Sequence, residues 1–286
     1  MKILIFGASG TVGSAVYRVL SAVDGYEVHG TFNKNKPSDF NEITWHKWDI
    51  ADIPGLNEML ASVKPGLVIS SLTGDFLQQS AAHRVMVDYL KTAGGRMIFV
   101  STANVFDGDV GGNHTEAALP YPISQYGDFK KSCEEMILWG LGANSLVVRL
   151  PKIISADIVE RVVQHVEKGN GFYTNLYFNF NTPENVADAL KHCLETKKSG
   201  ILHLVSRDYM SDDEMAKLTL AKAGLDMTYP ALQFSADSFC TTLGCNDVSK
   251  LRQSSDGGFY LTMTCTDEGI VSQYGISCAD AMGAKL

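Results

Sequence analysis

Short runs of apolar residues alternate with longer amphipathic stretches along the first 150 residues of the chain. The apolar runs predict strands at residues 2–6, 27–31, 42–47, 67–70, 96–101 and 145–150. The stretches between them predict helices at residues 11–23, 55–63, 78–93 and 124–141. Strands and helices that alternate at this spacing form right-handed β–α–β units around a parallel sheet. We therefore predict a doubly wound α/β fold of the Rossmann type.

The pattern becomes less regular after residue 150. It predicts helices at 156–168 and from 183 onwards, a short strand at 201–205, and a helix that opens with a capping box formed by Ser211 and Glu214. Residues 226–286 carry few clear signals. We expect a dinucleotide-binding domain made of residues 1–150 plus 177–206, and a substrate-binding lid made of residues 151–176 plus 207–286.

Composition limits the class of protein. With 45% hydrophobic residues the chain can bury a sizeable core, and its net charge of −8 argues against a nucleic-acid partner, which needs clustered positive charge. The apolar start, Ile3-Leu4-Ile5-Phe6, is too short for a signal peptide, and no run approaches the roughly 20 apolar residues of a membrane helix. We expect a cytoplasmic protein without a membrane partner, whose six cysteines are free thiols. The oligomeric state stays open, with a homodimer as one alternative.

A glycine-rich loop follows the first predicted strand directly and opens the first predicted helix. It reads Gly7-Ala8-Ser9-Gly10-Thr11-Val12-Gly13, with glycines at a spacing of G-x-x-G-x-x-G. Glycines here permit a tight turn and let the backbone approach a pyrophosphate closely. The free N–H groups at the helix N-terminus then favour the phosphates. A glycine-rich turn without a ligand is the alternative, but the position between a buried strand and a helix favours dinucleotide binding.

The residues after the second predicted strand bear on the choice between NADP(H) and NAD(H). Sites that prefer NAD place a carboxylate about 20 residues after the glycine loop. This chain has Asn33 there, followed by Lys34 and Lys36, and the two lysines suit a 2′-phosphate, so NADP(H) is favoured over NAD(H). The alternative is that both lysines belong to an ordinary solvated turn. Asp49, at the end of the third strand, is a candidate for hydrogen bonding to the adenine or simply a polar strand end.

A candidate catalytic group comes from two segments. Tyr126 and Lys130 are four residues apart on a predicted helix and therefore share one face. A nearby ammonium favours tyrosinate and lowers the pKa of the phenol, which can then act as a general acid towards a carbonyl oxygen. Thr102 follows a buried strand, at the sheet edge where ligands of such folds bind, and its hydroxyl can orient the carbonyl. An ordinary turn residue is the alternative for Thr102.

Three segments together resemble the extended short-chain dehydrogenase/reductase superfamily, and within it most closely the dTDP-4-dehydrorhamnose reductase family. They are the glycine loop, Ser101-Thr102-Ala103-Asn104-Val105-Phe106-Asp107-Gly108, and Pro122-Ile123-Ser124-Gln125-Tyr126-Gly127-Asp128-Phe129-Lys130. The similarity extends over roughly residues 1–225. It implies that Tyr126 is the general acid, that Lys130 binds the nicotinamide ribose and tunes Tyr126, and that Thr102 completes the group.

Further contacts follow from these assignments. The expected cofactor-binding residues are Gly7, Ser9, Gly10, Thr11, Val12, Gly13, Asn33, Lys34, Asp49, Ile50, Ser71, Tyr126 and Lys130. The expected substrate-binding residues are Asn104, Arg149 and Lys152, of which Lys152 suits a phosphate because it follows the last Rossmann strand. Members of the family that depend on a metal carry a glutamate where this chain has Ala15, so we expect no bound magnesium.

The chain departs from the family where the substrate is expected. The family usually reads S-T-D-Y-V-F-D-G, whereas Ala103 and Asn104 stand here in place of Asp and Tyr. The segments Ser70–Gly74, Leu150–Lys152 and Phe178–Thr182 also differ from the family pattern. We therefore expect a reductase of a keto group on a sugar or sugar nucleotide, in polysaccharide biosynthesis, with the substrate left open. A nucleotide-sugar epimerase and a non-catalytic NADP-binding regulatory protein are the alternatives.

Overall fold

The computed structural model describes residues 1–38, 40–238 and 248–283, and the chain divides into two compact units. The first unit contains residues 1–101, 132–148 and 183–202, and the second contains residues 102–131, 149–182 and 203–286. The chain passes between the units several times, so each unit is assembled from segments that lie far apart in the sequence.

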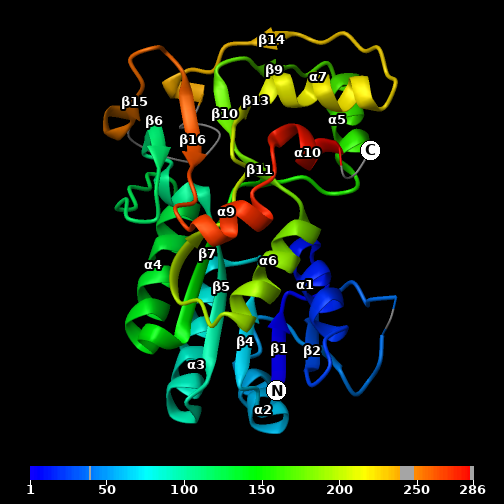
Figure 1. Ribbon diagram of the computed structural model, residues 1–286, viewed down its shortest axis with the longest axis vertical. Coiled ribbons are helices and arrows are strands. Elements are labelled where there is room, and N and C mark those ends of the chain that lie inside the picture. Colours follow the sequence, from blue (N-terminus) through cyan, green and yellow to red (C-terminus); the bar gives the residue numbers. More distant parts are fainter. Residues whose placement is uncertain (39, 239–247, 284–286) are drawn as a thin grey trace. The chain divides into compact units, whose positions relative to one another are not determined.

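A seven-stranded sheet in the order β12-β7-β5-β4-β1-β2-β3 organises the first unit (Figure 1). Its strands are β1 (Lys2–Phe6), β2 (Glu27–Phe32), β3 (Trp45–Lys47), β4 (Leu67–Ser70), β5 (Arg96–Thr102), β7 (Ser145–Leu150) and β12 (Gly200–His203). Neighbouring strands from β3 through β5 pair in parallel. Every residue of β4 and β7 is buried, which explains why most of their residues are apolar. The predicted Rossmann-type fold is confirmed.

Helices flank this sheet. They are α1 (Thr11–Ser21), α2 (Ile53–Val63), α3 (Phe76–Ala93), α4 (Gln125–Leu141), the short 3₁₀ helix η2 (Gly142–Asn144) and α6 (Pro183–Glu195). Helix α1 packs against α6, and α2 packs against α3. Two starts lie earlier than predicted because aspartates cap them: Asp52 accepts a hydrogen bond from the Gly55 amide and Asp75 one from the Gln78 amide, each at 2.9 Å.

The predicted strand at residues 42–47 is wrong in its first half. Only Trp45–Lys47 form β3. Asn41 forms a turn with the residues that follow it: its side chain accepts a hydrogen bond from the Ile43 amide at 2.9 Å, and its carbonyl accepts one from the Trp45 amide at 2.8 Å. An asparagine side chain that bonds its own backbone two residues on competes with strand pairing.

The second unit contains a five-stranded sheet in the order β13-β10-β16-β6-β15. These strands are β6 (Asp109–His114), β10 (Leu176–Phe178), β13 (Met210–Ser211), β15 (Arg252–Gln253) and β16 (Phe259–Met263). Two further pairs join β8 (Lys152–Ile153) to β11 (Phe180–Asn181) and β9 (Phe172–Tyr173) to β14 (Ala231–Leu232). The helices are η1 (Ala103–Phe106), α5 (Ile158–Glu167), α7 (Asp212–Lys222), η3 (Val248–Lys250), α9 (Glu268–Tyr274) and α10 (Cys278–Gly283).

Strand β6 is an element that the sequence did not predict. Its consecutive glycines, Gly111 and Gly112, remove the alternating or apolar pattern by which strands are recognised. Its residues 111–114 pair with β16, from the poorly patterned C-terminal region, and its first two residues pair with β15. Residues 102–131, which we expected within the dinucleotide-binding domain, accordingly belong to the second unit.

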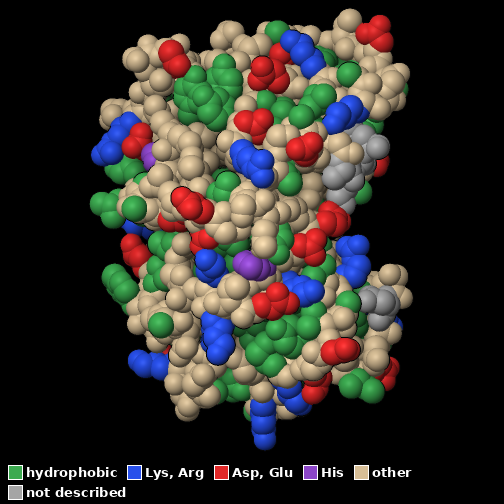
Figure 2. All heavy atoms as spheres, viewed as in Figure 1, with side chains coloured by type: hydrophobic (Ala, Val, Ile, Leu, Met, Phe, Trp, Pro, Cys, Tyr) green, Lys and Arg blue, Asp and Glu red, His purple; other side chains and the backbone are tan. Residues whose placement is uncertain are grey.

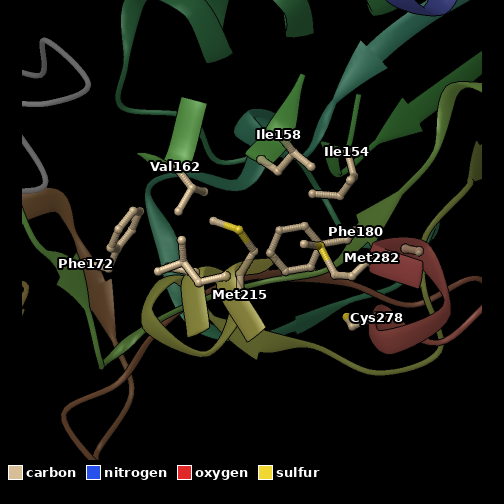
Figure 3. Close-up of a cluster of buried hydrophobic side chains, with 11 residues drawn as sticks. Ile154, Ile158, Val162, Phe172, Phe180, Met215, Cys278 and Met282 are labelled. Atoms are coloured by element: carbon tan, nitrogen blue, oxygen red, sulfur yellow. The ribbon is translucent and has the colours of Figure 1, made fainter. Parts of the chain in front are cut away.

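An apolar cluster joins α5, α7 and α10 in the second unit (Figure 3). Ile154, Phe180 and Met282 are completely buried in it, together with Met215 from α7 and Cys278 from α10. The predicted capping box that starts α7 is confirmed: Ser211 and Glu214 each accept a hydrogen bond from the other's backbone amide. The C-terminal residues therefore complete a core although their sequence carries weak local signals.

The surface charges and the cysteines of the described residues are consistent with the composition. Figure 2 shows acidic and basic side chains interspersed over the visible face. Four cysteines lie in the described residues, and all four are free; Cys240 and Cys245 lie outside them. Among the helices that the structure describes, none is both long enough and apolar enough to cross a membrane.

Candidate functional site

The glycine loop of the first unit is shaped by close backbone contacts. Gly7 has φ of +78°, a conformation that glycine adopts without strain, and its amide donates a hydrogen bond to the Thr31 hydroxyl at 3.1 Å. A Cβ atom on Gly13 would lie only 2.2 Å from the Gly7 carbonyl oxygen. Strand β1 and helix α1 can therefore approach this closely only with glycine at position 13.

The loop presents an uncapped helix N-terminus. Gly10 is the N-cap of α1, and no side chain caps the helix. The first N–H groups of a helix have no partner within the helix, and the helix dipole adds partial positive charge there. Ser9, Gly10 and Thr11 are exposed. The Ser71 hydroxyl closes the loop's other side by donating to the Phe6 carbonyl at 3.1 Å. An exposed, uncapped helix end behind a glycine turn fits the pyrophosphate of a dinucleotide.

The residues expected near the adenosine ribose lie together in the first unit. Asn33 donates a hydrogen bond to Asp49 at 3.0 Å, and the Ala51 amide donates to the other carboxylate oxygen of Asp49 at 3.0 Å. The Ala51 amide, then Asn33 and the charge of Lys34, hold the pKa of Asp49 below its ordinary value. Ile50 follows directly and is partly buried. Asp49 is thus a fixed carboxylate beside the candidate phosphate ligands.

The second unit brings Thr102, Tyr126 and Lys130 together. Thr102 is the last residue of β5, and Tyr126 and Lys130 lie in the first two turns of α4. The hydroxyls of Thr102 and Tyr126 are hydrogen bonded, and Lys130 Nζ lies 6.0 Å from the centre of the Tyr126 ring. Lys130 is only 5% exposed, whereas Tyr126 is 38% exposed. The arrangement places an accessible phenol between a hydroxyl and a buried ammonium.

The expected direction of the Tyr126 pKa is wrong. We expected Lys130 to lower it, but the pKa of Tyr126 lies above its ordinary value of 10, because the protein around the phenol replaces water and disfavours the anion. The hydrogen bond between Tyr126 and Thr102 acts in the opposite direction and is the weaker effect. Tyr126 is therefore protonated at neutral pH, as a proton donor must be.

A buried carboxylate that the sequence analysis missed orders the start of α4. Asp107 is completely buried and accepts hydrogen bonds from the Ile123 amide at 2.7 Å, the Ser124 amide at 3.1 Å and the Ser124 hydroxyl. Ser124 in turn accepts one from the Gly127 amide at 2.9 Å. Burial raises the pKa of Asp107, and these donors oppose the rise. The sequence did contain one signal for this arrangement: Ser124, three residues before Gly127, is a typical N-cap residue.

Position 127 has room only for glycine. A Cβ atom there would lie 2.3 Å from the Asn104 carbonyl oxygen and 3.0 Å from Asp107. The first turn of α4 therefore lies directly against η1 and the carboxylate that follows it. This contact fixes the position of Tyr126 with respect to Thr102, because Thr102 is the residue immediately before η1.

Arg149, an expected substrate ligand, lies in the interior of the second unit. It is 1% exposed, donates a hydrogen bond to His203 at 3.3 Å and has its guanidinium carbon 4.9 Å from the centre of the Phe106 ring. His203 donates through Nδ1 to the Thr264 carbonyl at 3.1 Å, so its Nε2 is the acceptor. Burial lowers the pKa of His203 to about 4, although Glu116 opposes this, and the ring is neutral.

Lys152, the other expected ligand beyond β7, is partly exposed and ion-paired. Its Nζ lies 2.7 Å from Asp212 Oδ1 and 4.6 Å from the centre of the Phe178 ring. Lys152 and Asp212 both line a cavity of about 510 Å³ whose walls come from α5, α7, β9 and β14. Lys152 thus faces open space of ligand size, but any anion there competes with Asp212 for its ammonium.

Comparison with known proteins agrees with this fold. Residues 75–238 match the family described as RmlD substrate binding domain. A probable low-salt glycan biosynthesis reductase of Haloferax volcanii is 24% identical over 259 residues, which cover 83% of this chain and 85% of that protein. The methionine adenosyltransferase 2 subunit beta of Rattus norvegicus is 24% identical over 242 residues, covering 75% and 70%.

A solved structure shares the fold over nearly the whole chain. The dTDP-4-dehydrorhamnose reductase of Bacillus anthracis, determined in complex with NADP, superimposes with a TM-score of 0.74 at 14% identity, covering 99% of this chain and 96% of that one. At this identity the similarity concerns the fold.

Proposed function

Because the chain belongs to the RmlD substrate binding domain family, we propose that it is an NAD(P)H-dependent reductase of a keto group on a sugar or sugar nucleotide. The observation that carries the proposal is the group formed by Thr102, Tyr126 and Lys130, which join a proton donor, an orienting hydroxyl and a buried cation. The relatives named as reductases support the same reaction class.

In the proposed reaction the glycine loop and Lys130 would hold a nicotinamide cofactor, which would supply the hydride for the carbonyl carbon. Tyr126 donates its phenolic proton to the carbonyl oxygen, so that the ketone becomes an alcohol and Tyr126 becomes tyrosinate until solvent returns a proton. Thr102, whose hydroxyl is hydrogen bonded to that of Tyr126, orients the carbonyl oxygen towards this phenol. The ammonium of Lys130 stabilises the tyrosinate while it lasts and is held in place by its burial.

The glycine loop fits the cofactor's pyrophosphate, with Gly7, Ser9, Gly10, Thr11, Val12 and Gly13 forming the turn and the uncapped helix end. Asn33, Lys34, Asp49, Ile50 and Ser71 would surround the adenosine part. Asn33 and Lys34 favour NADP(H) over NAD(H) in this proposal, because Lys34 is a cation where an NAD site has a carboxylate.

The substrate-binding part of the proposal rests on Asn104, Arg149 and Lys152 within the lid and its junctions. Lys152 beside the 510 Å³ cavity suits a phosphate of a sugar nucleotide. The burial of Arg149 favours a positioning role, in which it holds His203, over direct contact with the substrate. A cytoplasmic location is part of the proposal, as the place where nucleotide sugars would be met.

The test is NADPH consumption with a panel of 4-keto sugar nucleotides. Substituting Tyr126→Phe should lower kcat by roughly 100- to 10,000-fold and leave NADPH affinity unchanged, because only the proton donor is lost. Tyr209→Phe is the matched control, since Tyr209 is an exposed tyrosine outside the proposed machinery. Tight NADPH binding without turnover of any keto substrate would contradict the proposal.

The match to a methionine adenosyltransferase subunit favours a second candidate, a non-catalytic regulatory protein. In that case Tyr126→Phe would change neither cofactor binding nor partner binding. An epimerase is distinguished by a change in the substrate without net consumption of NADPH.

A further inference from the structure

Asn104 occupies an unusual place beside the proposed catalytic group. Its backbone amide donates a hydrogen bond to Thr102 Oγ1 at 3.2 Å, and the Thr102 hydroxyl donates back to Asn104 Oδ1 at 3.1 Å. Asn104 therefore makes two hydrogen bonds with the Thr102 hydroxyl. The backbone bond fixes where the Thr102 oxygen lies, and the side-chain bond fixes where its hydrogen points.

Asp107 determines which end of the Asn104 amide faces Thr102. The Asp107 carboxylate is surrounded by donors from residues 123 and 124 and is also hydrogen bonded to the Asn104 side chain. A carboxylate accepts hydrogen bonds, so Asn104 must present its NH₂ group to Asp107. Its oxygen is then left for Thr102, as the contact at 3.1 Å requires. The direction of the Thr102 hydrogen is thus set by a buried carboxylate three residues beyond Asn104.

The Thr102 hydroxyl has one hydrogen and two neighbours that can accept it. One is Asn104 Oδ1, and the other is the Tyr126 oxygen to which Thr102 is also hydrogen bonded. While Tyr126 is protonated, its own hydrogen can point to Thr102 Oγ1 and the Thr102 hydrogen can point to Asn104. Once Tyr126 is an anion, the Thr102 hydrogen stabilises it only by rotating away from Asn104.

We propose that Asn104 is a positioning residue, which holds the Thr102 hydrogen away from Tyr126 until Tyr126 has given up its proton. This inference rests on the proposed function, in which Tyr126 is the general acid. It assigns a role to the position at which the family usually has Tyr. Asn104 thereby keeps Tyr126 in its protonated, donating form and makes the Thr102 hydroxyl available to tyrosinate afterwards.

Two charged groups, Lys130 and Asp107, lie near this pair and also act on Tyr126. Lys130 lies on the same helix as Tyr126, with Nζ 6.0 Å from the ring centre. Asp107 follows η1 and would lie 3.0 Å from a Cβ atom on Gly127, the residue after Tyr126. Lys130 acts on Tyr126 in the wild type and in a variant of Asn104 alike. Asp107 loses one hydrogen-bond donor in such a variant. The same donor is lost in a Thr102→Val background, so a comparison between the two backgrounds isolates the Thr102 hydrogen.

The test is the titration of Tyr126 in protein labelled with ¹³Cζ-tyrosine, read by NMR without substrate or cofactor and assigned with Tyr126→Phe. Asn104→Leu keeps the backbone amide and approximate shape but removes the side-chain acceptor. The Thr102 hydrogen is then free to bond tyrosinate, and Tyr126 should titrate about one pH unit lower than in the wild type, the equivalent of one hydrogen bond. In a Thr102→Val background the same substitution should shift Tyr126 by much less.

Two outcomes overturn the inference. One is a Tyr126 titration that stays at or above the wild-type pH in Asn104→Leu, and the other is an equal shift in the Thr102→Val background, which would show an effect of packing alone. Circular dichroism at each pH confirms the fold, and Asn104→Ala replaces Asn104→Leu if the latter is unfolded. Because the titration needs no turnover, it decides the role of Asn104 separately from the NADPH assay that decides the proposed function.

Discussion

The glycine loop and the group around Thr102 are built from different parts of the polypeptide. In the loop the backbone makes the site: Gly7 takes a left-handed conformation, and Gly13 leaves no room for a Cβ atom. Around Thr102 side chains make the site, through the hydrogen bonds of Asn104, Asp107 and Ser124. A site made of backbone is damaged by adding atoms, whereas a site made of side-chain hydrogen bonds is damaged by exchanging a donor for an acceptor at constant shape.

The largest effect should come from adding one carbon to the loop. Gly13→Ala puts a Cβ atom 2.2 Å from the Gly7 carbonyl oxygen, so either the turn or α1 must move. We expect a loss of about 2–3 kcal/mol in the free energy of unfolding and a clear loss of cofactor affinity. Urea denaturation and NADPH titration measure both. Gly66→Ala is the control, because a Cβ atom there meets nothing within 4 Å; equal behaviour of the two variants would refute the steric account.

A change of pH should affect the buried contacts of His203 in the second unit and leave the glycine loop unchanged. His203 has a pKa of about 4 when folded against 6.5 when exposed. Between these values the unfolded chain binds the extra proton, so stability is fully present above pH 6.5 and decreases as the pH falls towards 4. The decrease should be about 2–3 kcal/mol near pH 4.5. His203→Gln should show a flatter dependence in urea denaturation from pH 7 to 4.5, and a parallel dependence would exclude His203 as the cause.

An isosteric exchange tests the side-chain site directly. Asp107→Asn keeps the shape but turns an NH₂ group towards donors that need an acceptor, among them the Ser124 and Ile123 amides. We expect a cost of about 2 kcal/mol in stability, with kcat lowered about tenfold and NADPH affinity unchanged. Thermal unfolding and steady-state kinetics give these values. If Asp107→Asn keeps both the kcat and the stability of the wild type, the carboxylate does not order α4.

The smallest effect concerns an exposed side chain of the proposed cofactor region. Lys34→Ala should raise the KM for NADPH about fivefold and leave the KM for NADH unchanged, because an exposed cation contributes modestly to binding a phosphate. Lys36→Ala is the control, since Lys36 lies over the Phe40 ring at 3.7 Å. An equal rise in both KM values would assign Lys34 to general binding and not to the choice of cofactor.

The sequence predicted more of the first unit than of the second. In the first unit, local patterns were sufficient for six of the seven strands of the large sheet and for the glycine loop, because each depends on residues close together in the chain. The turn at Asn41 was missed, since it is formed by one side chain against its own backbone. In the second unit, β6 was missed, and residues 226–286 had no assignment, because their partners are far away in the sequence.

The candidate site shows the same division at the level of single residues. Thr102, Tyr126 and Lys130 were identified from spacing and resemblance, since each type of side chain suits one step of a carbonyl reduction. The direction in which the Tyr126 pKa is shifted was not predicted, because it depends on how much water the folded chain removes from the phenol. Asp107 was also missed, since an acidic residue in a loop has no distinctive pattern until it is buried among four donors.

By itself the sequence determined the Rossmann-type architecture, the dinucleotide loop and the identity of the candidate catalytic residues. These depend on backbone propensity, periodicity and residue chemistry, all of which act locally. Only the tertiary structure decided that Arg149 is interior, that Asn104 faces Thr102 with its oxygen, and that Tyr126 stays protonated. Burial and hydrogen-bond direction arise when distant segments meet, so no local pattern encodes them.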